Sequence, residues 1–283
     1  MSVCSICGGK VVLNNLCREH FFVYFEDKVK KAISDFNLLH KKDKVCVAVS
    51  GGKDSVVLLY LLKKFGYNVS GLAIDEGIRG YRSLTLDFLE KFCRDLGVPL
   101  VVKSFRDETG RHLDEMVHEG PACNHCGTFR RFMLNKYSQG FDKVATGHNL
   151  DDEAQAVFMN LFKAQTELFD RQGPITREID GFTQKIKPLY YLREKEILAY
   201  AFLKKFDVPF VECPFARLSF RSRVRDFINA LEASNPGSKE NIIFNFLRLK
   251  KESVGVVVTN SCESCGFPCE GSVCKACRLK ASF

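Results

Sequence analysis

The chain has 283 residues, of which 46% are hydrophobic, and it carries a formal net charge of +8. This length suffices for one large core or two smaller ones. The longest apolar run of the first half, Val56 to Leu62, is far shorter than the about 20 residues of a membrane span. No apolar signal core opens the chain. We expect a soluble intracellular protein that does not enter membranes.

The cysteine content points to metal binding. The chain has 13 cysteines, an odd number, and intracellular thiols stay reduced, so a disulfide framework is not expected. The positive charge suits an acidic partner such as nucleic acid. This argument is weak, because metal ligation would remove thiol protons and make the protein less basic.

The first predicted element in chain order is a zinc finger. Cys4, Cys7, Cys17 and His20 form C-x2-C and C-x2-H pairs about one short knuckle apart. Four ligands at this spacing suit tetrahedral zinc, and a closed set of four favours a structural role. We place this finger in residues 1–25.

Strand-like and helix-like segments alternate in residues 26–255. The predicted strands are residues 44–50, 68–75, 99–105 and 142–149, and the predicted helices are residues 54–66, 84–97 and a segment from about 151. This alternation predicts the α/β class with a doubly wound, Rossmann-like parallel sheet. Ligands of such sheets bind beyond the carboxyl ends of the strands, where Ser50, Asp75 and Gly147 lie.

The string SGGKDS, residues 50–55, links the first predicted strand to the first predicted helix. It is not a Walker P-loop, because Val47 stands where that motif has glycine and Asp54 where it has Ser or Thr. Gly51 and Gly52 permit a tight turn with exposed amides, and the helix N-terminus adds partial positive charge. Side-chain donors can come from Ser50, Lys53 and Ser55. We interpret the loop as a nucleotide-phosphate site.

Three further cysteines lie inside the α/β part. Cys123 and Cys126 form an isolated C-x2-C pair, and Cys213 is a third candidate ligand from far downstream. Three thiolates can hold a [4Fe–4S] cluster with one open iron. A zinc site and a persulfide-forming pair are the alternatives. Cys46 and Cys93 stand among apolar residues and are expected to be packed core thiols.

A second zinc finger is predicted in residues 256–283. Its ligands are two C-x2-C pairs, and Cys269 lies between them as a spare cysteine. The four ligands are Cys262, Cys265, Cys274 and Cys277. With the first finger, the chain is expected to hold two Zn²⁺ ions.

Two groups of basic residues are candidates for contact with a phosphate backbone, with a solvated surface as the alternative. One group is in FARLSFRSRVRD, and the other flanks the string RQGP. The residues are Arg217, Arg221, Arg223, Arg225, Arg171, Arg177, Lys185 and Lys187.

The order of these motifs resembles the TtuA-type tRNA 2-thiouridine synthetases, which are PP-loop ATP pyrophosphatases. The resemblance rests on both fingers and on SGGKDS, CNHCG with FRR, TGHNLDDEA, RQGP, KPL, EC at Cys213 and RDF. It implies that ATP, with Mg²⁺, adenylates O2 of a tRNA uridine and releases pyrophosphate. Sulfur on the open iron of a three-cysteine [4Fe–4S] cluster then attacks C2, and AMP leaves.

The resemblance also implies roles for individual residues. Cys123, Cys126 and Cys213 would hold the cluster, and Asp152 would act at the reaction centre in metal binding or acid–base work. The nucleotide would contact Ala48, Ser50, Gly51, Gly52, Lys53, Asp54, Ser55, Ile74, Arg130, Gly147 and Asp152. Asp151 is expected to be an ordinary helix cap. His148 is either a site residue or a packed loop residue.

Two rival functions stay open from the sequence. One is a PP-loop ligase that joins an amine to an activated base, and the other is a zinc-ribbon RNA-binding protein with a vestigial ATP loop. The target is uridine 54 or the wobble uridine 34 of tRNA. The sulfur donor is a ubiquitin-like protein thiocarboxylate or free sulfide, and a homodimer is expected from the resemblance.

Overall fold

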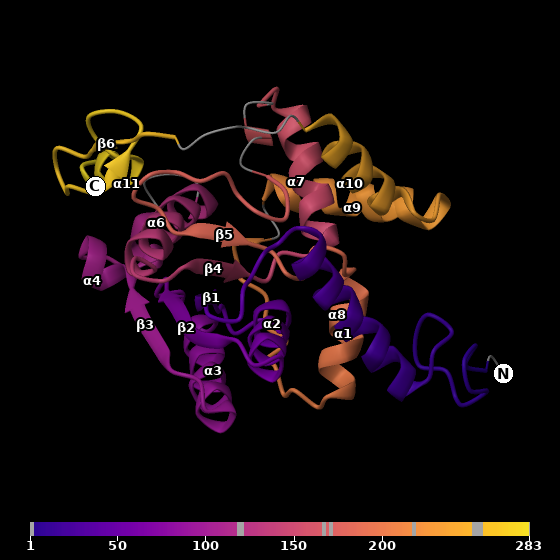
Figure 1. Ribbon diagram of the computed structural model, residues 1–283. Helices are drawn as coiled ribbons and strands as arrows, with labels where there is room; N and C mark the ends of the chain where they lie inside the picture. Colours follow the sequence, from indigo (N-terminus) through magenta and orange to yellow (C-terminus); the bar gives the residue numbers. More distant parts are fainter. Residues whose placement is uncertain are drawn as a thin grey trace.

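The computed structural model describes residues 3–117, 122–165, 168–169, 172–216, 219–250 and 257–282. Helices and strands alternate through most of the chain (Figure 1). In chain order the elements are α1 (Arg18–Asp35), β1 (Lys44–Ala48), α2 (Lys53–Lys64), β2 (Asn68–Asp75), α3 (Arg82–Leu96), β3 (Leu100–Ser104), α4 (Phe105–Thr109), α5 (Leu113–Met116), α6 (Ala122–Tyr137), β4 (Lys143–Thr146), α7 (Leu150–Phe162), β5 (Gln184–Ile186), α8 (Glu194–Leu203), α9 (Phe220–Ser234), α10 (Ser238–Leu249), β6 (Asn260–Ser261), β7 (Pro268–Cys269) and α11 (Lys275–Lys280).

The central sheet has the strand order β3-β2-β1-β4-β5, and all of its neighbouring strands are parallel. The prediction of a doubly wound parallel sheet is therefore confirmed. The chain runs from β1 outward through β2 to β3 and then returns to place β4 on the other side of β1. This reversal makes the carboxyl ends of β1 and β4 a topological switch point, where such folds bind ligands.

Side chains of β1 explain why both faces of the sheet are covered. Val45 and Val47 pack into the core shared with α1, α2, α3 and α8. Cys46 points the other way, into the core shared with α6. Burial raises the pKa of the Cys46 thiol to about 12 and that of Cys93 on α3 to about 11. Both are core thiols, as predicted.

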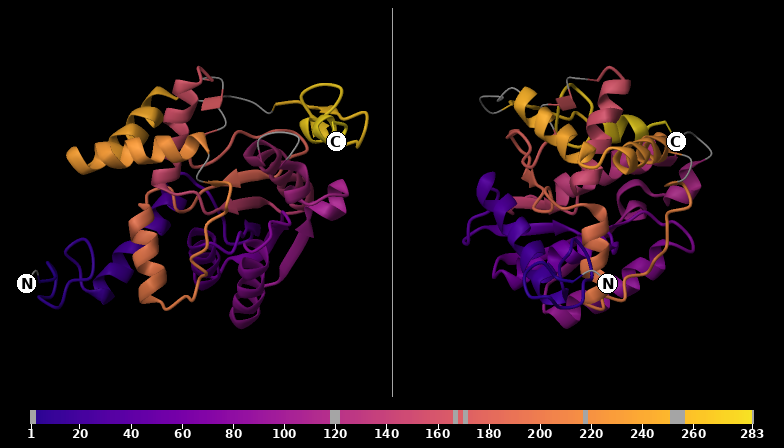
Figure 2. Two further views of the ribbon diagram at one scale, coloured as in Figure 1. Left: turned by 180° about the vertical axis from the view of Figure 1, so that it is seen from behind. Right: turned by 90° about the vertical axis from the view of Figure 1, so that its right-hand side faces the viewer.

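Helices α7, α9 and α10 pack against one another at the β5 side of the sheet (Figures 1 and 2). Their cluster contains Leu150, Ala154, Ile243 and Phe246 in its buried part. None of the helices in the described part of the chain combines the length and apolar character that crossing a bilayer requires.

The two cysteine-rich segments lie on opposite sides of the molecule (Figure 1). The N-terminal segment leads directly into α1. This helix is continuous across residue 25, where the first finger was predicted to end. The C-terminal one contains the small antiparallel pair β6–β7 and the helix α11, which packs against α6.

Candidate active site and metal centres

The loop between β1 and α2 makes a turn that is held by hydrogen bonds among its own residues. Gly51 has a φ of +81°, which an L side chain adopts at a cost. The Ser50 amide donates to Ser55 Oγ at 3.1 Å, and the Gly52 amide donates to Ser50 Oγ at 3.3 Å. Gly52 caps α2 without a side chain, so the first amides of this helix remain available to a ligand.

A cavity of about 240 Å³ opens beside this loop at the switch point. Its walls come from β1, β2, β4, the starts of α2, α3, α7 and α9, and the helix α6. Of the expected nucleotide contacts, those lining it are Ala48, Ser50, Asp54, Ser55, Ile74, Arg130, Gly147 and Asp152. Six further residues that line it had no role predicted from the sequence: Val49, Leu72, Glu76, Arg82, Leu134 and Thr146.

Gly147 lies against the start of α2. A Cβ on Gly147 would stand 2.9 Å from the Ser55 amide nitrogen and 3.0 Å from the carbonyl carbon of Asp54. Only glycine lets the end of β4 approach α2 this closely. The close approach leaves the Gly147 backbone as part of the cavity wall.

Lys53 does not line the cavity. Its Nζ donates to Asp54 Oδ2 at 3.1 Å and to Glu194 Oε1 at 2.8 Å. Its expected role as a direct phosphate donor stays a prediction, since a ligand would have to compete with these two carboxylates.

The two aspartates of TGHNLDDEA have different surroundings. Asn149 caps α7. Its side-chain Oδ1 accepts a hydrogen bond from the backbone amide of Asp152 at 3.1 Å, and its backbone amide donates to Asp152 Oδ2 at 3.3 Å. The expectation that Asp151 caps this helix is wrong. Asp151 is buried, accepts from the Glu194 amide at the start of α8 at 2.7 Å and pairs with Lys239.

Asp152 is the aspartate that faces the cavity. Its Oδ1 lies 3.5 Å from Nη1 of Arg221, which comes from α9. Burial raises the pKa of Asp152, and burial also raises that of Asp54, with the charge of Asp152 adding to the effect. Asn149 Nδ2 donates to Asp54 Oδ1 at 3.1 Å. The two carboxylates therefore share one wall, where a divalent cation with phosphate oxygens can join them.

His148 follows Gly147 at the end of β4. Its Nδ1 lies 2.8 Å from Thr146 Oγ1. The surrounding cavity walls and the charge of Lys187 lower the pKa of His148, whose ring is exposed at the cavity edge. The ring is therefore neutral at pH 7 and borders the cavity. Of the two expectations for this residue, its position favours the site residue.

A buried carboxylate connects the loop to the cysteine-bearing helix α6. Glu76 Oε2 lies 3.0 Å from Arg82 Nε, and Glu76 Oε1 lies 3.2 Å from Arg130 Nε. Arg82 Nη1 in turn donates to the Ser50 carbonyl at 2.6 Å. The position of Glu76 after Asp75 at a strand end was a usable signal. The sequence contains no signal for Arg82, because only the folded structure places it near Ser50.

Replacing Glu76 by Gln is expected to lower the free energy of unfolding by about 3 kcal/mol, because breaking a buried ion pair leaves uncompensated charge. Glu90→Gln, at an exposed position of α3, is the matched control and should change it by less than about 0.5 kcal/mol. Urea unfolding of both variants measures the difference. Equal stability of the two variants would contradict the bridging role of Glu76.

The three central cysteines converge near Arg130. The Cys123 thiol at the start of α6 donates to the Phe215 carbonyl at 3.7 Å, next to Cys213. Burial raises the pKa of the Cys126 thiol to about 11, although the charge of Arg130 opposes this effect. Within the described residues, these three sulfur atoms do not form a set with all separations under 4.8 Å. In this they differ from the two groups of cysteines near the ends of the chain.

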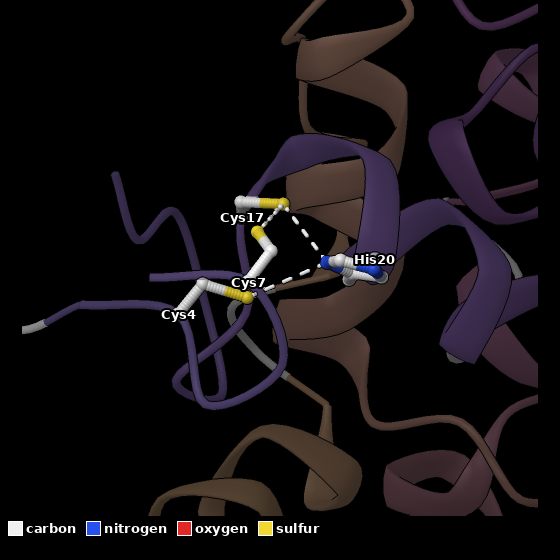
Figure 3. Close-up of side chains that lie close together, drawn as sticks. All are labelled: Cys4, Cys7, Cys17 and His20. Atoms are coloured by element: carbon white, nitrogen blue, oxygen red, sulfur yellow. Dashed lines mark hydrogen bonds between the residues drawn. The ribbon is translucent and has the colours of Figure 1, made fainter. Parts of the chain in front are cut away.

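The N-terminal cysteines form a compact four-ligand group (Figure 3). Cys4 Sγ lies 3.5 Å and Cys17 Sγ 3.3 Å from Nδ1 of His20, which is on α1, and Cys7 Sγ lies 3.7 Å from Cys17 Sγ. The ligand atoms of all four residues lie within 4.8 Å of one another. This donor set fits one tetrahedral zinc ion.

The C-terminal group is similarly compact. Cys262, Cys265, Cys274 and Cys277 also have all their sulfur atoms within 4.8 Å of one another. The Cys274 amide donates to Cys262 Sγ at 3.3 Å and lowers the pKa of the Cys262 thiol to about 6, which favours the thiolate that metals bind. Cys269 is outside the group and donates to the Gly271 carbonyl.

The expected basic contacts divide into several groups. Arg171 and Arg217 lie outside the described residues. Arg221 faces Asp152 in the cavity, and Arg225 Nε lies 3.4 Å from Asp226. Arg223 is exposed to solvent on α9. Arg177, Lys185 and Lys187 line a second cavity.

The comparisons with known proteins agree with this architecture. Residues 22–231 match the family model described as PP-loop domain. A Pyrococcus horikoshii protein named tRNA-5-methyluridine(54) 2-sulfurtransferase is 38% identical over 269 residues, which cover 93% of this chain and 87% of the relative. The tRNA 2-thiolation protein NcsA of Haloferax volcanii is 34% identical, with 99% of this chain and 98% of the relative covered.

A solved structure is also similar along the whole chain. It is the U34-tRNA thiolase NcsA from Methanococcus maripaludis with its [4Fe-4S] cluster, at a TM-score of 0.86 and 34% identity, covering 100% of this chain and 97% of that one. The chain therefore belongs to the TtuA- and NcsA-type tRNA 2-thiolation family of PP-loop proteins.

Proposed function

We propose that this protein is an ATP-dependent tRNA-uridine 2-sulfurtransferase. The observation that carries the proposal is the position of Arg130. This one side chain lines the cavity of the PP-loop, and it lies one helical turn after Cys126 on α6, where its charge favours the Cys126 thiolate. It therefore joins a nucleotide site to a cysteine site, as a reaction that uses ATP and sulfur at one base requires.

The nucleotide site is built mainly from backbone. We infer that the loop amides and the hydroxyls of Ser50 and Ser55 hold the phosphates of ATP, while the apolar wall at Ala48 and Ile74 receives adenosine. Asp54 and Asp152 share the wall where a Mg²⁺ ion would bridge protein and phosphates. The charges of Arg130 and Arg221 would neutralise the α-phosphate as its charge develops.

The proposed reaction has two steps. Uridine O2 attacks the α-phosphorus, the bond to the β-phosphate oxygen breaks, and pyrophosphate leaves. A hydrosulfide-level sulfur then attacks C2, the C2–O2 bond breaks, and AMP leaves with that oxygen. His148 is neutral at the cavity edge and can exchange a proton with the base or the sulfur in either step.

The central cysteines fit a [4Fe–4S] cluster, since Cys123, Cys126 and Cys213 provide the three thiols that a cluster with one open iron needs. Such a cluster supplies an open iron that binds hydrosulfide and lowers its pKa. We further propose that each terminal finger holds one structural zinc. In this division residues 26–255 form the catalytic part, and residues 1–25 and 256–283 form the fingers.

The partners follow from the same proposal. The substrate is tRNA, the sulfur comes from a ubiquitin-like protein thiocarboxylate or from free sulfide, and the working form is a homodimer. The relatives named above modify uridine 54 in one case and uridine 34 in another, so both positions are candidates.

The decisive experiment uses anaerobically purified protein, unmodified tRNA transcripts, ATP, Mg²⁺ and sulfide. Mass spectrometry of the nucleosides should find 2-thiouridine with equimolar AMP and pyrophosphate. Transcripts with cytidine at position 54 or position 34 locate the target. AMP formation with an amine but without sulfur would favour the ligase, and tRNA binding without AMP would favour the non-catalytic RNA-binding protein.

A further inference from the structure

A second cavity, of about 560 Å³, lies beside the nucleotide cavity. Four parts of the chain form its walls: α6, the end of β4, the segment of residues 176–187 that includes β5, and the C-terminal finger. Phe132 of α6 and Phe182 both pack edge-to-face on Phe267 of the finger, with ring centroids 5.3 and 5.4 Å apart. The finger is therefore seated on the α/β part, and the cavity is a built feature of that contact.

The two cavities meet at the end of β4. Leu134, Thr146 and His148 line both of them. At about 240 Å³, the first cavity has less than half the volume of the second. With ATP in the first cavity, little room is left there for a second nucleotide. A base that reacts with ATP must have its sugar and phosphate outside, and the second cavity adjoins the opening.

Two cations in the second cavity have no acidic partner. In the described part of the chain, no carboxylate oxygen lies within 4.0 Å of Arg131 or Lys185. Lys187 differs, since its Nζ lies 2.8 Å from Glu153 Oε1. Burial, together with the charges of Arg131 and Lys187, lowers the pKa of Lys185 to about 8. Arg131 is exposed and Lys185 is half-buried, so both cations are open to an anion that enters the cavity.

We propose that the second cavity binds the target nucleotide of tRNA, with a backbone phosphate held by Arg131 and Lys185 and the uracil passing His148 into the nucleotide cavity. This inference rests on the proposed function. The phosphate is the anion that the two cations lack, and Phe132 and Phe182 give the sugar and neighbouring base an apolar wall. The C-terminal finger would thereby act on RNA by shaping this cavity.

The test compares two charge-matched double variants of the full-length holoprotein. The first is Arg131→Gln with Lys185→Gln. The second, a control on the opposite face of the sheet, is Lys91→Gln with Arg94→Gln at exposed positions of α3. Both variants lose two positive charges, so an effect of net charge alone would be equal in them. Affinity for tRNA at several salt concentrations, affinity for ATP without tRNA, and thiolation are measured.

The first variant should bind tRNA about tenfold more weakly, and the slope of log affinity against log salt should fall by about 1, as expected for one lost phosphate contact. Its affinity for ATP should be unchanged, and the control should match the wild type in all three measurements. Wild-type affinity and salt slope in the first variant would overturn the inference. So would normal tRNA binding with weaker binding of a protein sulfur donor, which would assign the cavity to the donor.

The proposed function fails separately, if the wild-type protein forms no 2-thiouridine. In that case the inference falls with it. A wild-type protein that thiolates tRNA, alongside a first variant that does so with an unchanged KM for tRNA, overturns the inference alone.

Discussion

Cys213→Ala is expected to remove iron from the anaerobically purified protein while both zinc ions remain. Cys213 is half-buried and lies two residues before Phe215, whose carbonyl accepts a hydrogen bond from the Cys123 thiol. Alanine fits the space of Cys213 without adding a polar group. Two cysteines cannot replace three as ligands of a cluster with one open iron. Since even outer-shell changes at metal sites cost about 10- to 100-fold, loss of a ligand should lower thiolation by more than about 100-fold.

Cys269→Ala is the matched control for this variant. Cys269 is also half-buried and lies outside both four-ligand groups, so its loss should leave iron, zinc and thiolation unchanged. Iron, zinc and acid-labile sulfide per chain are measured for the wild type and both variants. About four iron and two zinc in the wild type would agree with the proposal. A wild type that holds no iron after anaerobic reconstitution would exclude the cluster, and a persulfide on Cys126 or Cys213 would become the leading route.

The strands β1 and β2 were predictable because most of their residues are buried. Segments such as residues 44–50 and 68–75 are apolar runs bounded by turns, and β1 and β2 appear there. The strand β5 was missed because its three residues, Gln184, Lys185 and Ile186, have no strand pattern of their own. Only pairing with β4 makes them a strand.

The helix α1 was missed although its signal is present. Phe21, Phe25, Val29 and Ile33 recur at helical spacing and are buried along one face. The prediction for this part of the chain was a zinc finger in residues 1–25, and it did not include the helix that follows the cysteines. The helix supplies His20, so finger and helix are one continuous feature.

The residues of the candidate site also differ in how well the sequence predicts them. The PP-loop residues are adjacent in sequence, so their proximity could be read directly. Arg82, Glu76 and Arg221 reach the cavity from α3, the end of β2 and α9, and no local pattern gives that convergence. Arg221 shows the difference most clearly: its helix reads as a basic surface, and tertiary packing places its guanidinium beside Asp152.

Gly51→Ala is expected to weaken ATP binding by about 100-fold, while the protein stays folded. Alanine at a φ of +81° costs about 1–2 kcal/mol. A Cβ at this position would also stand 2.6 Å from the Thr85 carbonyl oxygen, a backbone atom that cannot turn aside. The loop must therefore move, and two lost amide–phosphate hydrogen bonds at about 1.5 kcal/mol each correspond to about 100-fold in affinity.

Gly66→Ala separates the clash from the backbone cost. Gly66 ends α2 with a φ of +78°, nearly that of Gly51, and a Cβ there meets no atom within 4 Å. This variant should lose about the same 1–2 kcal/mol of stability and keep the ATP affinity of the wild type. Calorimetric titration with ATP and thermal unfolding of both variants test the difference. If both variants bind ATP equally well, the loop does not hold the phosphates in the conformation described, and the nucleotide must bind elsewhere along the sheet edge.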